Sequence, residues 1–371
     1  MRTLRYSAIS LMTLAASLVF LRAEEFQKAP AQSAWEILRQ IVMVPGISGK
    51  EGKVADFVQT TLASTTGKVQ RDEMNNVWVT VGQGKPNILF VAHLDELGMT
   101  VDKITLQGII KPKGSGGVFT QTWEGWPVLV HTAKGPRTGI VIPRPGYDKN
   151  DAAKTPFLAE SMEIDLGVSS EAEARALGVS EGDAIVFKKR IADLSPDIMA
   201  TRAVDDRAGC AAVLEAALRL DPKKIGGRSI TFAWSVQEET GLTGAAKMAR
   251  TMKPDYVFAV DTFVSSDSPL DDKRFAFAPV GKGAVIRAID SSNIIPRPEM
   301  DKLIGIAKNN NIPIQLANSR GGNDGSVFVA GGATDIPLSW PGAHAHSFIE
   351  KIHRADLEAL VDLILAVCQE W

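Results

Sequence analysis

Cysteine is scarce in this chain, which has only Cys210 and Cys368 among its 371 residues. At most one disulfide can therefore form within the chain. Both cysteines lie in apolar patterns of helical period, over residues 208–218 and 357–367. We interpret them as two small buried residues and not as a disulfide pair.

A surplus of charge of either sign is also missing. The 41 basic and 43 acidic residues give a formal net charge of -2, so we expect no nucleic-acid partner. Repeats and low-complexity segments are absent from the sequence. Hydrophobic residues make up 45% of the chain, which is enough for a sizeable core and two domains.

The amino terminus differs from the rest of the chain. Arg2 and Arg5 precede an apolar stretch over residues 8–21, which has the length of a signal-peptide core and is short for a membrane span. We expect cleavage after Ala23, although Leu21 is not the small residue that such a site prefers. The sequence thus predicts an exported protein, periplasmic or extracellular, with no membrane association after cleavage. An uncleaved membrane anchor is the alternative.

Helical and extended patterns alternate in two stretches of the chain. A capping box at Ser33 predicts a helix to about Val42. Further helices are expected over residues 51–63, 206–220, 244–252, 298–309 and 354–368. Strands are expected over residues 76–82, 87–93, 229–236, 255–260 and within 333–340. Such alternation predicts an α/β fold with a mostly parallel sheet flanked by helices.

Residues 99–199 have a different pattern. Short segments rich in Val and Ile are separated by Gly and Pro, and one helical stretch over 170–177 interrupts them. This pattern favours a small all-β domain. We therefore expect a signal peptide over 1–23, an α/β domain formed by 24–98 and 200–371, and an inserted β domain over 99–199.

Ionisable side chains follow the predicted strands of the α/β domain. They are His93, Asp95, Glu238, Glu239, Asp261 and His346, joined by Asp205 before a predicted helix. Because sites in parallel sheets form at the carboxyl ends of strands, we expect these groups to lie close together. Imidazole and carboxylate bind zinc, and one carboxylate can bridge two ions. The pattern indicates a paired-metal site that activates water and polarises a carbonyl or phosphoryl oxygen.

Each of these residues alone also has an ordinary structural explanation. His93 could be a hydrogen-bonded residue at a strand end, and Asp206 could cap the helix that follows it. The doublet Glu238-Glu239 could be solvated surface. In a metal site, however, adjacent glutamates point in different directions, so one can bind metal while the other accepts a proton. The combination, with each group ending a hydrophobic strand, favours the metal site.

These residues belong to motifs that resemble a known family. In chain order the motifs are "AHLDELGM", "AVDDRAGCAAVLEA", "SVQEETGLTGA", "AVDT", "GGNDGSVF" and "HSF". Together they are similar to the M42 family of metallo-aminopeptidases, over about residues 33–369. The resemblance implies a zinc-peptidase-like α/β fold with an inserted β domain.

The resemblance also implies a role for each candidate residue. One metal ion would be bound by His93, Asp205 and Asp261, and a second by Asp205, Glu239 and His346. Glu238 would be the general base that acts on a metal-bridging water, and Asp95 would orient the imidazole of His93. The cofactors implied are two divalent ions per chain, zinc first, with cobalt and manganese as alternatives.

Peptides with a free amino terminus are the substrates that the resemblance implies. It also implies a homo-oligomer, up to a dodecamer, in which the inserted domain shapes substrate access. The chain departs from the family pattern at His344, two residues before His346, and at Asn323, where threonine is common. The alternatives are a co-catalytic metal carboxypeptidase, an N-acyl amino-acid deacylase, and a metal-binding assembly protein without catalysis.

Overall fold

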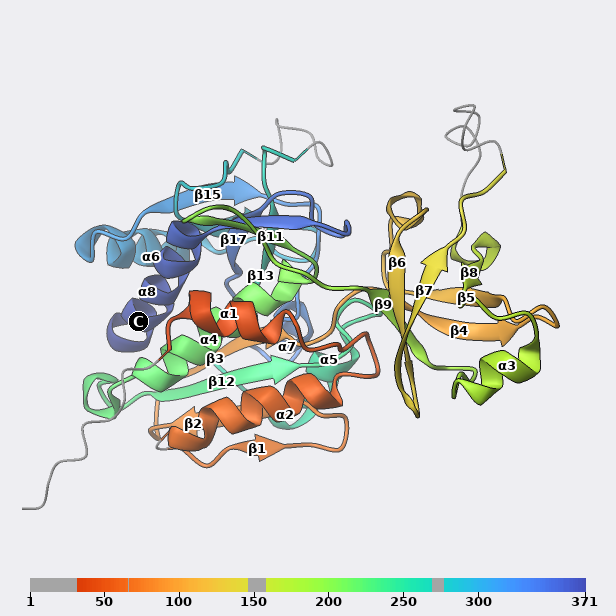
Figure 1. Cartoon of the computed structure of the whole chain (residues 1–371). Coiled ribbons are helices and arrows are strands. Elements are labelled where there is room, and N and C mark those ends of the chain that lie inside the picture. Colours follow the sequence, from red (N-terminus) through yellow and green to blue (C-terminus); the bar gives the residue numbers. More distant parts are fainter. Residues whose placement is uncertain (1–31, 66, 146–157, 269–276) are drawn as a thin grey trace, which may run out of the picture. The chain divides into compact units, whose positions relative to one another are not determined.

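The computed structural model describes residues 32–65, 67–145, 158–268 and 277–371 (Figure 1). The predicted signal peptide over residues 1–23 lies outside the described residues. Among the helices that are described, none has the length and apolar character needed to cross a membrane.

A nine-stranded sheet forms the centre of the α/β part, in the order β1-β2-β12-β3-β13-β17-β14-β15, with β16 paired to β13. The strands are β1 (Gln70–Arg71), β2 (Val77–Val81), β3 (Asn87–His93), β12 (Ser229–Ser235), β13 (Tyr256–Val264), β14 (Ala284–Ile289), β15 (Ile314–Asn318), β16 (Thr334–Asp335) and β17 (Leu338–Gly342). The four central strands β12, β3, β13 and β17 are parallel to one another. The mostly parallel sheet predicted from the sequence is confirmed at its centre, while β1, β2 and β14 add antiparallel pairings.

Helices precede, connect and follow the strands of this sheet. They are α1 (Ala34–Ile41), α2 (Gly52–Thr61), α4 (Val204–Arg219), α5 (Thr243–Thr251), α6 (Arg297–Asn309), α7 (Ser326–Val329) and α8 (Arg354–Glu370). The capping box predicted at Ser33 is present, because its side chain accepts from the Glu36 amide while the Glu36 carboxylate accepts from the Ser33 amide. His353 caps α8 in the same way, by accepting from the Ala355 amide.

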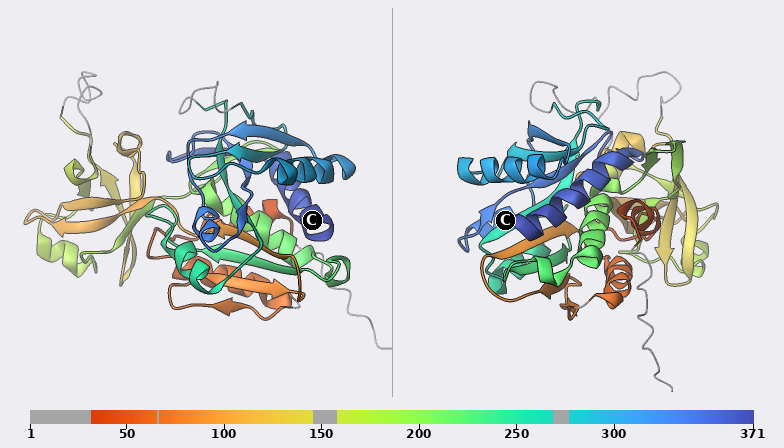
Figure 2. Two further views of the ribbon diagram at one scale, coloured as in Figure 1. Left: turned by 180° about the vertical axis from the view of Figure 1, so that it is seen from behind. Right: turned by 90° about the vertical axis from the view of Figure 1, so that its left-hand side faces the viewer.

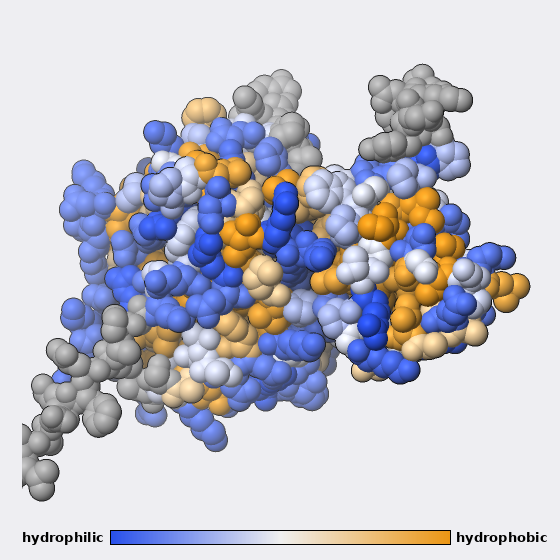
Figure 3. Space-filling view, in the orientation of Figure 1, coloured by the Kyte–Doolittle hydropathy of each residue, from blue (hydrophilic) through white to orange (hydrophobic). Residues whose placement is uncertain are grey.

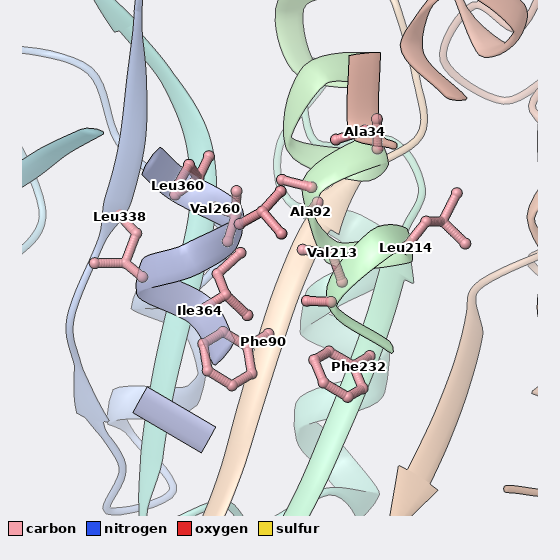
Figure 4. Packing of buried hydrophobic residues seen from close by; sticks show 14 of the residues in the cluster. Ala34, Phe90, Ala92, Val213, Leu214, Phe232, Val260, Leu338, Leu360 and Ile364 are labelled. Carbon is pink, nitrogen blue, oxygen red and sulfur yellow. The ribbon is translucent and has the colours of Figure 1, made fainter. Parts of the chain in front are cut away.

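Alternate residues of the central strands face two separate apolar layers. Phe90 of β3 belongs to the larger cluster, with Phe232 of β12 and with residues of α1, α4 and α8. Figure 4 shows Phe90 and Phe232 beside Val213 of α4 and Ile364 of α8. Residues of the opposite parity pack against α5 and α7 in a second cluster. Figure 2 shows the sheet and its covering helices from two further sides. Helices therefore cover both faces of the sheet, as the alternation predicts.

Strands between Gly98 and Phe187 form a closed barrel, in the order β4-β5-β8-β7-β6-β9. They are β4 (Gly98–Ile104), β5 (Ile110–Ser115), β6 (Pro127–Thr132), β7 (Gly135–Val141), β8 (Ile164–Asp165) and β9 (Ala184–Phe187), with helix α3 (Glu171–Ala176) alongside. The last strands of the segment predicted as one β domain do not join this barrel. Instead β10 (Ala192–Ser195) and β11 (Ile198–Thr201) form a three-stranded sheet with β18 (Glu350–His353).

We predict that Phe90→Ala lowers the free energy of unfolding by about 3–5 kcal/mol, because its ring is fully buried. The ring stacks between Phe232 and Phe258, with centroids 5.6 and 5.1 Å away. Denaturant-induced unfolding measures this loss. The control Leu106→Ala, at a side chain that is 78% exposed, should change stability by less than about 0.5 kcal/mol. Equal losses in the two variants would contradict this description of the core.

Candidate metal centre

A crevice opens at the carboxyl edge of the central sheet because two parallel strands change partners there. Strand β13 pairs with β3 through Ala259 and with β17 from Val260 onward. Strand β3 continues beside β12 as far as His93, which lies opposite Ser235. The sheet therefore divides just before His93 and Asp261. Gaps of this kind are where α/β proteins place their ligand sites.

His93, Asp205 and Asp261 form the first of two groups of side chains that could hold a metal ion, called the first group below. Their nearest nitrogen and oxygen atoms lie within 4.8 Å of one another, and all three residues are buried. His93 Nε2 is 3.4 Å from Asp205 Oδ1 and 3.8 Å from Asp261 Oδ1. Asp261 is an internal residue of β13 and not a residue after the strand, so the predicted strand end at Val260 was wrong by four residues.

Asp205, Glu239 and His346 form the second group, again with ligand atoms within 4.8 Å of one another. His346 Nε2 lies 3.5 Å from Asp205 Oδ2 and 3.8 Å from Glu239 Oε2. Asp205 thus turns one carboxylate oxygen toward the histidine of each group. This is the arrangement in which one carboxylate can bridge two ions.

A cavity of about 280 Å³ joins the two groups, and Glu238 lines it together with all five of these residues. Glu238 belongs to neither group. Its backbone amide and that of Glu239 both donate to the carboxylate of Asp95. The adjacent glutamates are therefore held by one acceptor, with Glu239 in the second group and Glu238 at the cavity wall.

The ionisation of the carboxyl groups is strongly perturbed by their burial. Burial, together with repulsion from the Asp205 charge, raises the pKa of Glu239 to about 8. Burial likewise holds the pKa of Glu238 well above its ordinary value, with added repulsion from Asp261. Burial also acts to raise the pKa of Asp205, but the nearby imidazoles of His346 and His93 outweigh it and lower the pKa. The cavity thus gathers more carboxyl groups than its two histidines can balance.

The residues present fit divalent metal ions. Each group offers imidazole and carboxylate, which are ligands of zinc. Asp205 Oδ1 is buried and has no hydrogen-bond partner among the described residues. An ion at the first group would give this oxygen a partner, and ions at both groups would offset the carboxylate repulsion.

Asp95 supports both groups from behind. Its Oδ1 lies 3.4 Å from His93 Nδ1, on the ring nitrogen that faces away from the first group. Its Oδ2 accepts from the hydroxyl of Ser48 at 2.6 Å. Burial acts to raise the pKa of Asp95, but the hydrogen bond and charge of His93 outweigh it, and the pKa is lowered. A carboxylate behind a ligand histidine fixes its orientation and raises its basicity.

Other ionisable residues in or near the motifs lie outside the two groups. Glu96 is fully buried and pairs with Lys189 at 2.6 Å. Asp206 accepts from the Gly209 amide, as a cap of α4 would. His344 is absent from the residues that line the cavity. Cys210 and Cys368 are both free and buried, as the sequence predicts.

Arg287 is a part of the cavity that sequence reasoning missed. It lies on β14, a strand that the sequence pattern did not reveal, and it is 2% exposed. Its Nη1 donates to Asp261 Oδ2 at 3.1 Å and its Nη2 donates to the Gly322 carbonyl at 2.7 Å. Arg287 lies in a short apolar strand, three residues before Asp290, and this stretch of sequence forms no recognisable motif. Only the fold brings it to Asp261.

Comparisons with known proteins show the family of this chain. A family model described as M42 glutamyl aminopeptidase matches residues 75–363. The chain belongs to the M42 family. The resemblance stated from the motifs is thereby confirmed, and the chain is a peptidase that hydrolyses peptide bonds.

The names of relatives within the M42 family specify different amino acids, such as lysine and glutamate. A lysyl aminopeptidase of Pyrococcus furiosus is 29% identical, over 91% of this chain and 97% of its own length. A glutamyl aminopeptidase of Lactococcus lactis is 27% identical, over 85% of this chain and 90% of its own. The solved TET1 peptidase of Pyrococcus horikoshii, which can assemble into a tetrahedron or a large octahedral shell, is 35% identical. It superposes with a TM-score of 0.83 over 91% of this chain and all of its own.

We predict that Asp95→Asn lowers metal affinity by about 10- to 100-fold, because the variant loses the charge that faces His93. Its amide nitrogen would also confront a backbone amide donor, from Glu238 or Glu239. Titration of the metal-free protein with zinc measures the effect. Ser48→Ala, which removes one neutral hydrogen bond to Asp95, should have a much smaller effect. A larger effect of Ser48→Ala than of Asp95→Asn would contradict the role given to Asp95.

Proposed function

We propose that the protein is an aminopeptidase with two divalent metal ions, which removes residues from the free amino terminus of peptides. The observation that carries this proposal is the position of Asp205, with one oxygen toward each of the histidines His93 and His346. His93, Asp205 and Asp261 would hold one ion, and Asp205, Glu239 and His346 the other. When bound, such ions polarise the substrate carbonyl and lower the pKa of water.

Glu238 is the general base of the proposed reaction. It lines the cavity with the ligand residues and belongs to neither group, so its carboxylate remains available to exchange protons. Glu238 accepts a proton from water as the water oxygen forms a bond to the carbonyl carbon. It then delivers that proton to the amine nitrogen as the carbon–nitrogen bond breaks. Asp95 contributes by fixing the backbone amide of Glu238.

The charges of the cavity favour a free amino terminus over a free carboxylate. Its carboxylates would attract the protonated amine of a peptide. A carboxypeptidase needs a cation that binds the substrate carboxylate, and Arg287 is the one arginine or lysine among the described residues that line the cavity. Both terminal nitrogens of Arg287 already donate to Asp261 and Gly322. The carboxypeptidase alternative is therefore the weaker proposal.

The barrel contributes to the proposed access of substrate. Its loop after β5 borders the second group, because a Cβ built on Gly116, whose φ is +80°, would lie 3.3 Å from Glu239 Cβ. A Cβ on Gly117 would lie 3.3 Å from His346 Nδ1. The ring of Phe119 lies 6.0 Å from that of His346. These contacts support a role of the inserted domain in shaping access to the site.

A homo-oligomer is part of the proposal, since the TET1 relative assembles into closed shells. Large hydrophobic side chains on the barrel are exposed, which is unusual for a surface that faces only water. They include Trp126 at 39%, Ile140 at 45% and Leu158 at 63%. Figure 3 shows hydrophobic residues gathered on one face of the part that Figure 1 labels β6 and β7. This face is a candidate contact between copies of the chain.

Export is proposed from the sequence alone. The charged and apolar pattern over residues 1–23 supports an exported enzyme that acts on peptides outside the cytoplasm. Amino-terminal sequencing of the protein recovered from its host tests this proposal. A mature terminus near Glu24 is expected, and a protein that keeps Met1 in the cytoplasmic fraction would contradict export.

The proposed reaction is tested with matched peptides that have free or blocked amino termini. We expect about two metal ions per chain and release of amino-terminal residues from free peptides only, with loss of activity on chelation. Glu238→Gln should lower kcat by about 10²- to 10⁴-fold, because a general base contributes that factor. Its metal content should stay unchanged, because Glu238 belongs to neither group.

Glu73→Gln is the matched control, at a glutamate side chain that is 81% exposed, and it should retain full activity. Hydrolysis of blocked peptides alone would favour the deacylase alternative. Full activity of Glu238→Gln would contradict the proposed mechanism. A metal content that falls in Glu238→Gln would instead make Glu238 a ligand.

A further inference from the structure

Glu350 is a buried carboxylate that lies behind the second group and has no place in the mechanism above. It is 1% exposed and stands on β18, at the end of the loop that carries His346. Its Oε2 accepts from the backbone amide of Asp205 at 3.0 Å. Its Oε1 accepts from the backbone amide of His346 at 3.2 Å. One side chain thus holds the main chain of two residues that are 141 positions apart in the sequence.

Both of these ligand residues lie in irregular backbone that does not position itself. Asp205 has a φ of -76° and a ψ of 112°, which is not helical although α4 begins at Val204. His346 has a φ of +62°, in the left-handed region that residues other than glycine rarely adopt. Neither main chain is fixed at this point by a regular ladder or helix. The hydrogen bonds to Glu350 therefore have a direct influence on where the two side chains point.

Arg202 holds Glu350 in this position. Its Nη1 donates to Glu350 Oε1 at 3.1 Å, and its side chain is 4% exposed. Its Nη2 donates to the carbonyl of Leu97, in the segment that leads from β3 into the barrel. Arg202 thus gives Glu350 a partner of opposite charge within the fold, as a buried carboxylate requires. The pair joins the segment after β3 to the loop that carries His346.

We propose that Glu350 is a positioning residue of the metal centre, which sets the second group by fixing the amides of Asp205 and His346. The inference rests on the proposed function, because it takes the second group to bind an ion. Glu350 supports this group through the main chain, while Asp95 supports the first group through the ring of His93. Asp205 belongs to both groups and His346 to the second alone. Loss of Glu350 therefore weakens the second ion more than the first.

A different role for Glu350 would be to stabilise the fold alone, by joining β18 to the segment before α4. Asp356 serves as a matched control that distinguishes a role in the metal centre from a role in the fold alone. It is a fully buried carboxylate on α8 that accepts from two backbone amides, those of Gly281 and Gly283, at 2.6 and 2.7 Å. Neither of these hydrogen bonds involves a residue of the two groups. The two carboxylates make the same kind of hydrogen bonds, and only those of Glu350 reach ligand residues.

The test titrates metal-free protein with zinc, in competition with a chromophoric chelator, for the wild type and for three variants. Glu350→Gln keeps the size of the side chain but replaces one acceptor by a donor. Glu350→Asp keeps the charge beside Arg202 but shortens the reach to the two amides. Asp356→Asn is the control, and thermal unfolding of the metal-free proteins is measured in parallel.

We expect both Glu350 variants to bind one ion with an affinity near that of the wild type. The other ion should bind about 10- to 100-fold more weakly, so that the ratio of the two dissociation constants rises. Asp356→Asn should lower the unfolding temperature and leave both dissociation constants unchanged.

Unchanged affinities in the Glu350 variants would overturn the inference, and so would a failure of both variants to fold while Asp356→Asn folds. An equal weakening of both ions would show that Glu350 does not act on the second group in particular. A wild type that binds fewer than two ions would instead contradict the proposed function.

Discussion

The sharing of Asp205 between two histidines is the constraint on which the rest of the site depends. Its two oxygens lie 3.4 and 3.5 Å from His93 and His346, which come from opposite ends of the α/β part of the sequence. This position requires that β3 and β13 separate after Val91, because a continuous sheet would leave no room at the carboxyl edge. The division of the sheet into two halves therefore creates the space in which these side chains meet.

The site must also keep many negative charges out of water. Three supporting groups hold the candidate ligand residues in place: Asp95 behind His93, Arg287 beside Asp261, and the pair of Arg202 and Glu350. Each of them is buried, and each makes hydrogen bonds or ion pairs with a ligand residue or its backbone. Pre-organised support of this kind limits how far a ligand side chain can move when an ion enters or leaves.

Periodicity and motifs predicted the elements that are long and strongly patterned, such as the helix opened by Ser33 and the strand that ends in His93. They also identified every residue of the two groups, because each lies in or beside one of the quoted motifs. They missed β14 and β18, which are short and lack a clear alternation of polar and apolar residues. Arg287 and Glu350 lie on these strands, so the supporting residues were not recognisable before the fold placed them. The local sequence identifies the candidate ligand residues, whereas tertiary contacts determine which residues support them.

The most direct test of this account is anomalous diffraction from crystals of the protein loaded with zinc. The account predicts two peaks in the cavity, one beside His93 and Asp261 and the other beside Glu239 and His346, with one oxygen of Asp205 directed to each. A single peak, or peaks that Asp205 does not contact, would contradict the paired-metal site.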